Sequence, residues 1–561
     1  PSHRMPLLYR LFPFLSWPRP SPELLRADIL AGLSVGLMVI PQGVAYATLA
    51  GMPLITGIYA AMLPALIAVL FSASSRLSVG PTALTALLIG TSLTGLAQPG
   101  SAQWVEMAVW LALMSGALQV GLGLIRFGWL LNLVSAPVLM AFTQGAALLI
   151  IGSQLPALLG LEGNWHQVVN LSAWHLPSAT FGLSCLVLLT LAKRWKPAFP
   201  TVLLIVVASA GVSFWTGFET SGGAVVGALP QGLPTLYLAK LPDWQTVQTL
   251  LLPTLVITLV SFLETASSAK IDNEKAGRRW NQNQDLIGQG LGKITSGLCG
   301  SFPTSSSFSR SALTLYAGAR SGWATIASVT VVLIVLLAFT RVLSHVPQAV
   351  LAAIVLTAVS GLIKPRAFMK LWKISRAEAS TALVTLVITV AAAPALHWGV
   401  LSGMLMGLSY FLYLRLHPRI IEVGLHPDGS LRDRHLWHLQ PIAPNVYALR
   451  MDAELDFASA SDLLRAISEH ITHHPDHRHI CLFAQPINRI DATGVEAFSQ
   501  LCKTVASHGM TLHLSGLKLP VEQLLRRAGE LTNPAQPVMY RSDAEALKSL
   551  RALAVPFNAQ N

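Results

Sequence analysis

The chain has 561 residues, of which 53% are hydrophobic and only 11% are charged. Soluble proteins carry about 25% charged residues, and the apolar residues here form successive runs long enough to cross a bilayer. The composition therefore excludes a soluble globular protein and predicts an α-helical polytopic membrane protein. The formal net charge of +12 reflects membrane topology and indicates no nucleic-acid partner.

Two series of seven apolar segments are predicted in the first three quarters of the chain. The first covers residues 28–49, 55–73, 82–96, 104–125, 128–151, 176–192 and 200–217. The second covers residues 250–270, 286–300, 309–318, 322–341, 346–362, 380–395 and 398–416. We therefore expect a cytoplasmic N-terminal segment (1–27) and a transmembrane transport domain (28–418), with repeat one at about 28–217 and repeat two at about 250–416.

The basic residues between these segments fall on one side of the membrane. If the N-terminus is cytoplasmic, nearly all of them lie inside, including Arg76, Lys193 and Lys275, and only Lys240 and Arg341 lie outside. This asymmetry follows the positive-inside rule. It predicts a multi-pass protein of the cell membrane, with a bacterial inner membrane favoured and both termini in the cytoplasm.

Two apolar segments are unusually short, and each follows a polar strip. "LSVGPTA" (77–83) precedes one, and "SFPTSSSFSRSALTLYAG" (301–318) opens the other. Either strip alone is equally compatible with an ordinary kink between packed helices. Broken helices at matching positions of two halves, however, are typical of inverted-repeat transporters with a site near the midplane. Because helix N-termini carry free N–H groups that bind anions, the pair favours an anion site, and Pro81 suits a first helical turn.

After residue 418 the composition becomes mixed. Strands are predicted at 445–451, 479–483 and 511–515, and helices at 459–473, 494–507 and 521–528. Alternating strands and helices predict a small α/β domain, which we place at 440–555 in the cytoplasm. Neither the histidine-rich run 470–479 nor the four cysteines have metal-ligand spacing, so no metal site is predicted.

Four motifs together resemble one protein family. They are "PQGVAYATLAG" (41–51), "SSRLSVGP" (74–81), "SFSRSA" (307–312) and "NRIDATG" (488–494). In this order, and over nearly the whole chain, they resemble the sulfate permease (SulP) family of anion transporters. The resemblance implies seven plus seven inverted transmembrane segments forming core and gate domains, a cytoplasmic STAS domain and a homodimer. The STAS domain is also a possible docking site for a cytoplasmic partner.

The resemblance further implies which residues bind the anion. Gln42 and Tyr46 lie four apart on one helix face and match positions that line the family's pocket, although the residues alone favour interhelical hydrogen bonding. The donors expected on the two half-helices are Thr82, Ala83, Ser307, Phe308 and Ser309. Helix N-capping uses the same groups, so it does not exclude anion binding.

Two ionisable residues are expected beside this site. An Arg near the midplane is unfavourable unless it pairs with a carboxylate or lines a watery cavity, so we expect Arg310 to line the cavity, with Glu264 as its partner in the empty protein. Glu264 follows an apolar run of 14 residues (250–263), short for a span of about 20, so we place it within the membrane. A solvated helix end is the alternative. The resemblance implies that Glu264 couples transport to protons, and sodium is disfavoured because the sodium-coupled members have Asp there.

The expected function is secondary active transport of a small inorganic oxyanion, with sulfate favoured, by proton-coupled symport and alternating access. Bicarbonate, a dicarboxylate such as fumarate, anion exchange and an uncoupled channel stay open. A membrane-anchored sensor is disfavoured because an anchor needs no broken helices. Without a nucleophile–base pair or a metal set, neither an enzyme nor a resident cofactor is predicted.

One residue of the α/β domain is a regulatory candidate. Thr493 in "DATG" matches the phosphorylatable position of the STAS family. The favoured role of this stretch is structural, with Asp491 capping the following helix.

Overall fold

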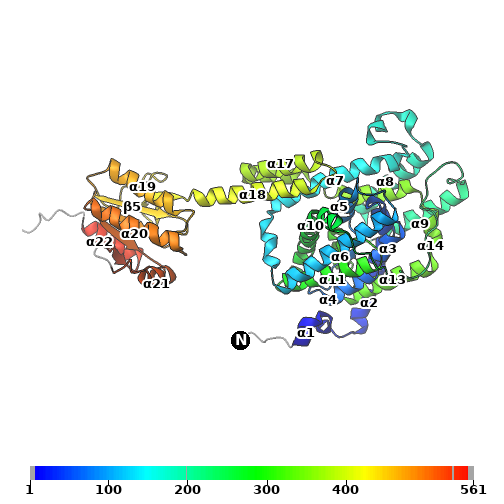
Figure 1. Cartoon of the computed structure of the whole chain (residues 1–561), viewed down its shortest axis with the longest axis horizontal. Helices are drawn as coiled ribbons and strands as arrows, with labels where there is room; N and C mark the ends of the chain where they lie inside the picture. The colour runs from blue at the N-terminus through cyan, green and yellow to red at the C-terminus, as the bar shows by residue number, and fades with distance from the viewer. Residues whose placement is uncertain (1–6, 197–198, 533–535, 554–561) are drawn as a thin grey trace, which may run out of the picture. The chain divides into compact units, whose positions relative to one another are not determined.

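The computed structural model describes residues 7–196, 199–532 and 536–553 of the chain. It contains two compact units, Pro1–Gly407 and Leu408–Asn561 (Figure 1). Residues 1–6 of the expected N-terminal segment and 554–555 of the expected α/β domain lie outside the described residues.

The first unit is helical. Its first half contains α1 (Leu7–Leu11), α2 (Pro22–Leu49), α3 (Ile55–Ala60), α4 (Leu63–Phe71), β1 (Val79–Gly80), α5 (Ala83–Leu93), α6 (Ala102–Leu124), α7 (Ala136–Leu159), α8 (Leu176–Trp195) and α9 (Thr201–Thr216). Its second half contains α10 (Trp244–Ala276), α11 (Gln282–Leu298), β2 (Ser305–Ser306), α12 (Phe308–Tyr316), α13 (Trp323–Ala338), α14 (Thr340–Ser344), α15 (Gln348–Ser360), α16 (Pro365–Ile374) and α17 (Arg376–Ala391). α18 (His397–Leu416) follows.

Seven helices among the described residues are long and apolar enough to cross a membrane. They occupy Pro22–Leu49, Ala102–Leu124, Ala136–Leu159, Leu176–Trp195, Trp244–Ala276, Gln348–Ile374 and His397–Leu416. Shorter apolar helices lie between them, including Ala83–Leu93 and Trp323–Ala338. The helices that follow the two polar strips, α5 (Ala83–Leu93) and α12 (Phe308–Tyr316), are short enough to span a bilayer only in part, as expected.

The helices of the first unit pack in two groups. In one group, α11 packs against α4 and α6, and α13 packs against α2. In the other, α15 and α17 pack against α7, and α8 packs against α15.

Glycines bring α6 and α11 into close contact. A Cβ atom added at Gly116 would lie 2.7 Å from the carbonyl oxygen of Gly290, and one added at Gly290 would lie 2.6 Å from that of Gly116. Small residues at such positions allow helix backbones to approach in a membrane. This contact holds α11, which carries the buried Lys293, against α6.

The second unit contains a six-stranded sheet in the order β4-β3-β5-β6-β7-β8. Its strands are β3 (Ile420–Leu425), β4 (Leu431–Asp433), β5 (Val446–Met451), β6 (His479–Phe483), β7 (Thr511–Ser515) and β8 (Val538–Tyr540). Its helices are α19 (Ala460–His473), α20 (Ala492–Ser507), α21 (Leu519–Arg527) and α22 (Asp543–Ala552). β5 to β8 run parallel, whereas β3 is antiparallel to both of its neighbours.

The two faces of this sheet have separate apolar cores. Leu449 of β5 and Leu482 of β6 pack with residues of α19, α20 and α21. Their chain neighbours Ala448 and Phe483 point to the opposite face and pack with α22. The alternation follows from the two-residue period of a strand, and it confirms the predicted α/β domain.

Three sequence expectations need correction. The apolar segment 55–73 forms two helices, α3 and α4, because the chain is broken at residues 61–62. Pro81 does not lie in the first turn of α5, since Thr82 is the N-cap and the helix begins at Ala83. The strands β3, β4 and β8 and the helix α22 were not expected from the pattern.

Candidate functional site

The two polar strips pair with each other. β1 and β2 are antiparallel, with Val79 opposite Ser306 and Gly80 opposite Ser305. The backbone N–H of Ser307 also donates to the carbonyl oxygen of Ser78 over 2.9 Å. This pairing brings the N-termini of α5 and α12 together from opposite halves of the unit.

Each half-helix starts with a hydroxyl cap. The Thr82 hydroxyl accepts from the N–H of Thr85 at 3.3 Å, and the Ser307 hydroxyl accepts from the N–H of Arg310 at 3.4 Å. The N–H groups of a helix's first turn have no partner within that helix. Those of Ala83 and Ser309 have no other recorded partner in the part of the chain that the structure describes. They are therefore available to an anion.

Arg310 lies beneath this pair of helix starts and is fully buried, with an exposed fraction of 0%. Its Nε donates to the Ser78 hydroxyl (3.2 Å), its Nη1 to Gln42 Oε1 (3.2 Å) and its Nη2 to the carbonyl oxygen of Pro81 (2.8 Å). The planar guanidinium thus connects α12 to α2 and to the β1 strip through hydrogen bonds.

The expected pairing of Arg310 with Glu264 is wrong, as is the expectation that its side chain lines an open cavity. Among the described residues no carboxylate lies within ion-pair distance of Arg310. The physical reason is that neutral acceptors from α2 and from the strip around β1 occupy the donors of the buried guanidinium. Residue spacing alone does not reveal these long-range acceptors.

Glu264 instead contacts the other half-helix. It lies on α10 and is half-buried, and the Thr82 hydroxyl is 3.3 Å from its Oε2 and 3.5 Å from its Oε1. Thr82 therefore links this carboxyl group directly to the cap of α5. Its half-buried position and its contact with Thr82 favour a place inside the protein over a solvated helix end.

The other expected site residues divide into buried and accessible ones. Gln42 and Tyr46 are buried in α2, and Gln42 Oε1 accepts from Arg310 Nη1. Phe308 and Ser309, in contrast, expose their side chains at the start of α12. Ala83 is half-buried, while Ser307 and Thr82 are buried.

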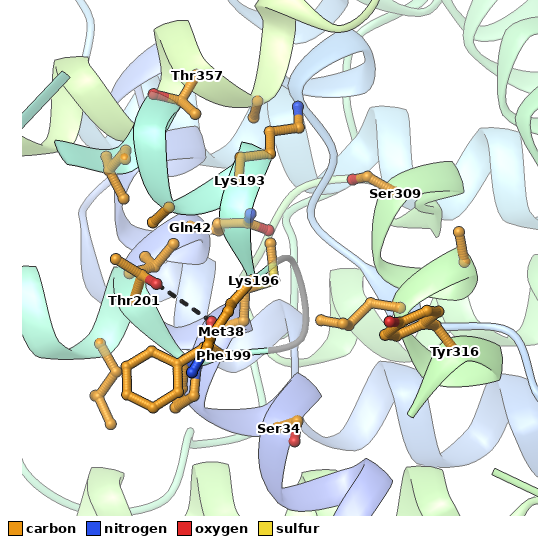
Figure 2. A pocket seen from close by; sticks show the side chains of 18 of the residues that line it. Ser34, Met38, Gln42, Lys193, Lys196, Phe199, Thr201, Ser309, Tyr316 and Thr357 are labelled. Atoms are coloured by element: carbon orange, nitrogen blue, oxygen red, sulfur yellow. Dashed lines mark hydrogen bonds between the residues drawn. The ribbon is translucent and has the colours of Figure 1, made fainter. Parts of the chain in front are cut away.

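A cavity of about 470 Å³ leads to this site. Gln42 and Ser309 both line it, together with α8, α9 and α15 residues (Figure 2). Its walls are mainly apolar, but Lys193, Lys196 and Lys275 also line it. All three lysines belong to the side that the positive-inside rule places in the cytoplasm.

Sequence reasoning missed a second buried cation. Lys293 of α11 is fully buried, and its Nζ donates to Gln119 Oε1 of α6 at 2.8 Å and to the Ser261 hydroxyl of α10. The Ser261 hydroxyl in turn donates to that of Ser305 in β2 at 3.1 Å. A single lysine within a glycine-rich apolar run was the available signal, since an isolated buried charge in a membrane is a functional candidate.

In the second unit, Asp491 caps α20 as favoured from the sequence. Its Oδ1 accepts from the N–H of Gly494 at 2.7 Å, and its Oδ2 accepts from the N–H of Phe457 at 3.0 Å. Thr493 is exposed in the first turn of the helix. Among the described residues, no group of His, Cys, Asp or Glu side chains could hold a metal ion.

Comparison with known proteins identifies the family. The model of the sulfate permease family matches residues 25–385, and that of the STAS domain matches residues 440–545. The chain belongs to the sulfate permease family. It is therefore an anion transporter and not an enzyme, and the predicted polytopic membrane fold with a C-terminal STAS domain is confirmed.

Relatives match over nearly the whole chain. A probable sulfate transporter of Mycobacterium tuberculosis is 30% identical over 537 residues, covering 94% of this chain and 95% of the relative. Probable sulfate transporter 4.2 of Arabidopsis thaliana is 30% identical over 552 residues, covering 92% of this chain and 80% of the relative.

Solved structures share the fold at lower identity. The murine Slc26a9 anion transporter in its inward-facing state matches with a TM-score of 0.87 and 21% identity, covering 97% of this chain and 95% of that one. The transmembrane domain of a cyanobacterial bicarbonate transporter matches with a TM-score of 0.59 and 19% identity, covering 69% of this chain and 99% of that one. These likenesses show the fold alone.

Proposed function

We propose that this protein is a secondary active transporter that carries a small inorganic oxyanion together with a proton, with sulfate as the favoured substrate. The observation that carries the proposal is the contact of Glu264 with Thr82, the cap of α5, beside the free N–H groups of Ala83 and Ser309. One carboxyl group thus lies at the site where the anion would bind.

The chemistry of the site suits an oxyanion. Backbone N–H groups at two helix N-termini favour negative charge through both hydrogen bonds and dipoles. The exposed hydroxyl of Ser309 and the buried guanidinium of Arg310 add to the positive potential. Sulfate is favoured over bicarbonate or a dicarboxylate because the more similar relatives bear the name of sulfate transporters.

Proton coupling follows from charge. An ionised Glu264 repels an incoming anion, whereas a protonated Glu264 removes that repulsion and can still donate a hydrogen bond. Proton and anion therefore support each other's binding, and this coupling is reciprocal. The cavity lined by Gln42 and Ser309 (Figure 2) is then the cytoplasmic entrance of an inward-facing state, and closing it completes alternating access.

The proposal also covers the oligomeric state of the transporter and its membrane location. We place it as a homodimer in the cell membrane, a bacterial inner membrane being favoured, with both termini in the cytoplasm. Thr493 remains a regulatory proposal. It rests on the exposure of this side chain beside the Asp491 cap. If Thr493→Ala leaves transport intact and the residue is never found phosphorylated, the proposal fails.

The decisive variant is Glu264→Gln in proteoliposomes. We expect sulfate uptake driven by an inward proton gradient to disappear, while sulfate binding persists because Gln keeps a hydrogen-bonding side chain of the same size. Glu106→Gln is the matched control, since Glu106 lies on α6 and accepts from the backbone N–H of Lys240, away from the site.

Two outcomes would contradict the proposal. Unchanged proton-driven uptake in Glu264→Gln removes the coupling role and leaves an exchanger or an uncoupled channel. A wild-type protein that moves bicarbonate or a dicarboxylate but not sulfate corrects the substrate.

A further inference from the structure

Lys293 is a fully buried charge without a counter-charge. Its exposed fraction is 0%, and its two recorded hydrogen-bond acceptors, Gln119 and Ser261, are neutral. Across residues 7–196, 199–532 and 536–553, no carboxylate lies within ion-pair distance of its Nζ. Burying an uncompensated ion is unfavourable by several kcal/mol, so the charged form of Lys293 is stable only when negative charge comes from elsewhere.

The surroundings of Lys293 show where that charge can come from. α4 has no ionisable residue, and α6 presents the neutral Gln119, whose Nε2 has no partner among the described residues and whose Oε1 is turned towards the ammonium group. β2 contributes the Ser305 hydroxyl, which is bonded to Ser261. From α10, Ser261 and Glu264 lie three residues apart on one helix face. Glu264 is thus the ionisable group that faces Lys293.

Arg310 is likewise a buried basic group whose acceptors carry no charge. It is fully buried, and its acceptors Gln42, Ser78 and Pro81 are all neutral. Glu264 lies near both groups, because it contacts Thr82, which follows the Arg310 acceptor Pro81, and lies three residues from the Lys293 acceptor Ser261. The binding region therefore contains two basic groups, Lys293 and Arg310, and one carboxyl group that can gain or lose a proton.

Charge balance then distinguishes anions by valence. When Glu264 is protonated, the two cations are neutralised by one divalent anion. When Glu264 is ionised, one monovalent anion suffices. A monovalent anion that enters with a proton leaves one buried positive charge unbalanced, which a membrane interior disfavours.

We propose that Lys293 is a specificity-determining residue that adapts this transporter to a divalent oxyanion carried with a proton. The inference rests on the proposed function and deepens it. It acts through the total charge of the site, because Lys293 lies behind Ser261 and Ser305 and does not itself contact the anion. Without this charge, Arg310 alone balances a monovalent anion that enters with a proton.

Two variants test the charge of Lys293 in opposite ways. Lys293→Gln removes the positive charge, whereas Gln119→Glu keeps the lysine and supplies a permanent counter-charge with almost no change in shape. Radiolabelled sulfate and radiolabelled chloride uptake are measured in proteoliposomes of the full chain at acidic external pH. Lys370→Gln, an exposed position on α16, is the matched control.

We expect both variants to lower the ratio of sulfate to chloride uptake by about tenfold or more, equivalent to about 1.4 kcal/mol, while Lys370→Gln leaves it unchanged. An unchanged ratio in either folded variant overturns the inference, and so does the loss of both anions in a folded variant. If neither variant folds, Glu264→Gln is measured instead, because its amide side chain is permanently neutral. It must then bind sulfate in preference to chloride at every pH, and a preference for chloride overturns the inference.

The two proposals fail in different ways. A wild-type protein that moves neither anion contradicts the proposed function. A wild-type protein that moves chloride with protons as readily as sulfate contradicts the role of Lys293 alone.

Discussion

Arg310 combines structural and electrostatic roles through its three hydrogen bonds. Its Nε, Nη1 and Nη2 reach acceptors of Ser78, Gln42 and Pro81, and all three belong to the opposite half of the unit from α12. A planar fork reaches all three acceptors from three different nitrogens, whereas an ammonium group offers its donors from a single nitrogen. The residue therefore keeps the two helix starts together and also makes their surroundings positive.

We expect Arg310→Lys to keep the positive charge but to lose hydrogen bonds that join α12 to α2 and to the β1 strip. Leaving a buried acceptor without a donor costs about 1–3 kcal/mol, so the variant should melt at a lower temperature in detergent and bind sulfate at least about tenfold more weakly. Arg341→Lys, at an exposed position, is the control. Melting and binding equal to those of wild type would show that the hydrogen bonds of Arg310 are not needed.

Two histidines of the STAS domain make its stability depend on pH. Burial, followed by neighbouring histidines, lowers the pKa of His513 and of His470 to about 4. His513 also contacts the Tyr540 hydroxyl (3.1 Å) and His479 (3.0 Å). The folded domain thus favours the neutral rings.

Since the pKa of histidine in an unfolded chain is about 6.5, the unfolded state binds more protons below that pH, and stability falls as pH decreases from about 6.5 towards 4. Hydrogen exchange of β5 to β7, corrected for intrinsic rates, should show this loss of protection. His513→Gln should reduce the pH effect, and the exposed His473→Gln should not. The same pH dependence in both variants would contradict the assignment.

At the scale of elements, the half-helices were predictable and their partners were not. Gly80-Pro81 and the serine-rich strip at 301–307 cannot continue a helix, and each lies at the same place in its half of the chain. The burial of Lys293, in contrast, depends on the contact of Gly290 with Gly116 in another helix. Nothing in the local sequence of α11 reveals that neighbour.

The unexpected β3–β4 hairpin had a local signal. "HPDGS" (426–430) contains an Asp-Gly turn, in which Asp428 Oδ1 accepts from the N–H of Ser430 and Gly429 has a positive φ of 86°. Such turns are typical of hairpins. The strand β4 has only three residues, too few to show an alternation, so the turn was the main signal for this hairpin.

Close contact between α2 and α3 provides a test of packing near the site. A Cβ atom added at Gly57 would lie 1.8 Å from the carbonyl oxygen of Gly43, whereas one added at Gly121 would meet nothing within 4 Å. Overpacking a well-filled core costs about 1–3 kcal/mol. We therefore expect Gly57→Ala to lower the melting temperature and the yield of folded protein, and Gly121→Ala to leave both unchanged. Equal melting of the two variants would contradict the contact.

At the scale of the whole molecule, the charge carried in one cycle has a measurable consequence. A divalent anion that enters with one proton moves a net single negative charge, and an inside-negative potential opposes this movement by about 2.3 kcal/mol per 100 mV. Net uptake then needs a steep proton gradient, more protons or exchange for another anion.

We expect sulfate uptake into proteoliposomes to slow under an inside-negative potassium diffusion potential and to accelerate under an inside-positive one. Uptake that does not respond to the potential would indicate that two protons accompany sulfate or that another anion leaves in exchange. Glu264→Gln, under the same potentials, controls for leakage of the vesicles.

The central claim is that the starts of α5 and α12, from opposite halves of the chain, together bind the transported anion. Locating bound selenate by anomalous scattering in crystals of the full chain tests this claim most directly. The account predicts selenate within hydrogen-bond distance of the N–H groups of Ala83 and Ser309, beside Glu264. Selenate bound only among Lys193, Lys196 and Lys275 of the cavity, with the two helix starts empty, would contradict it.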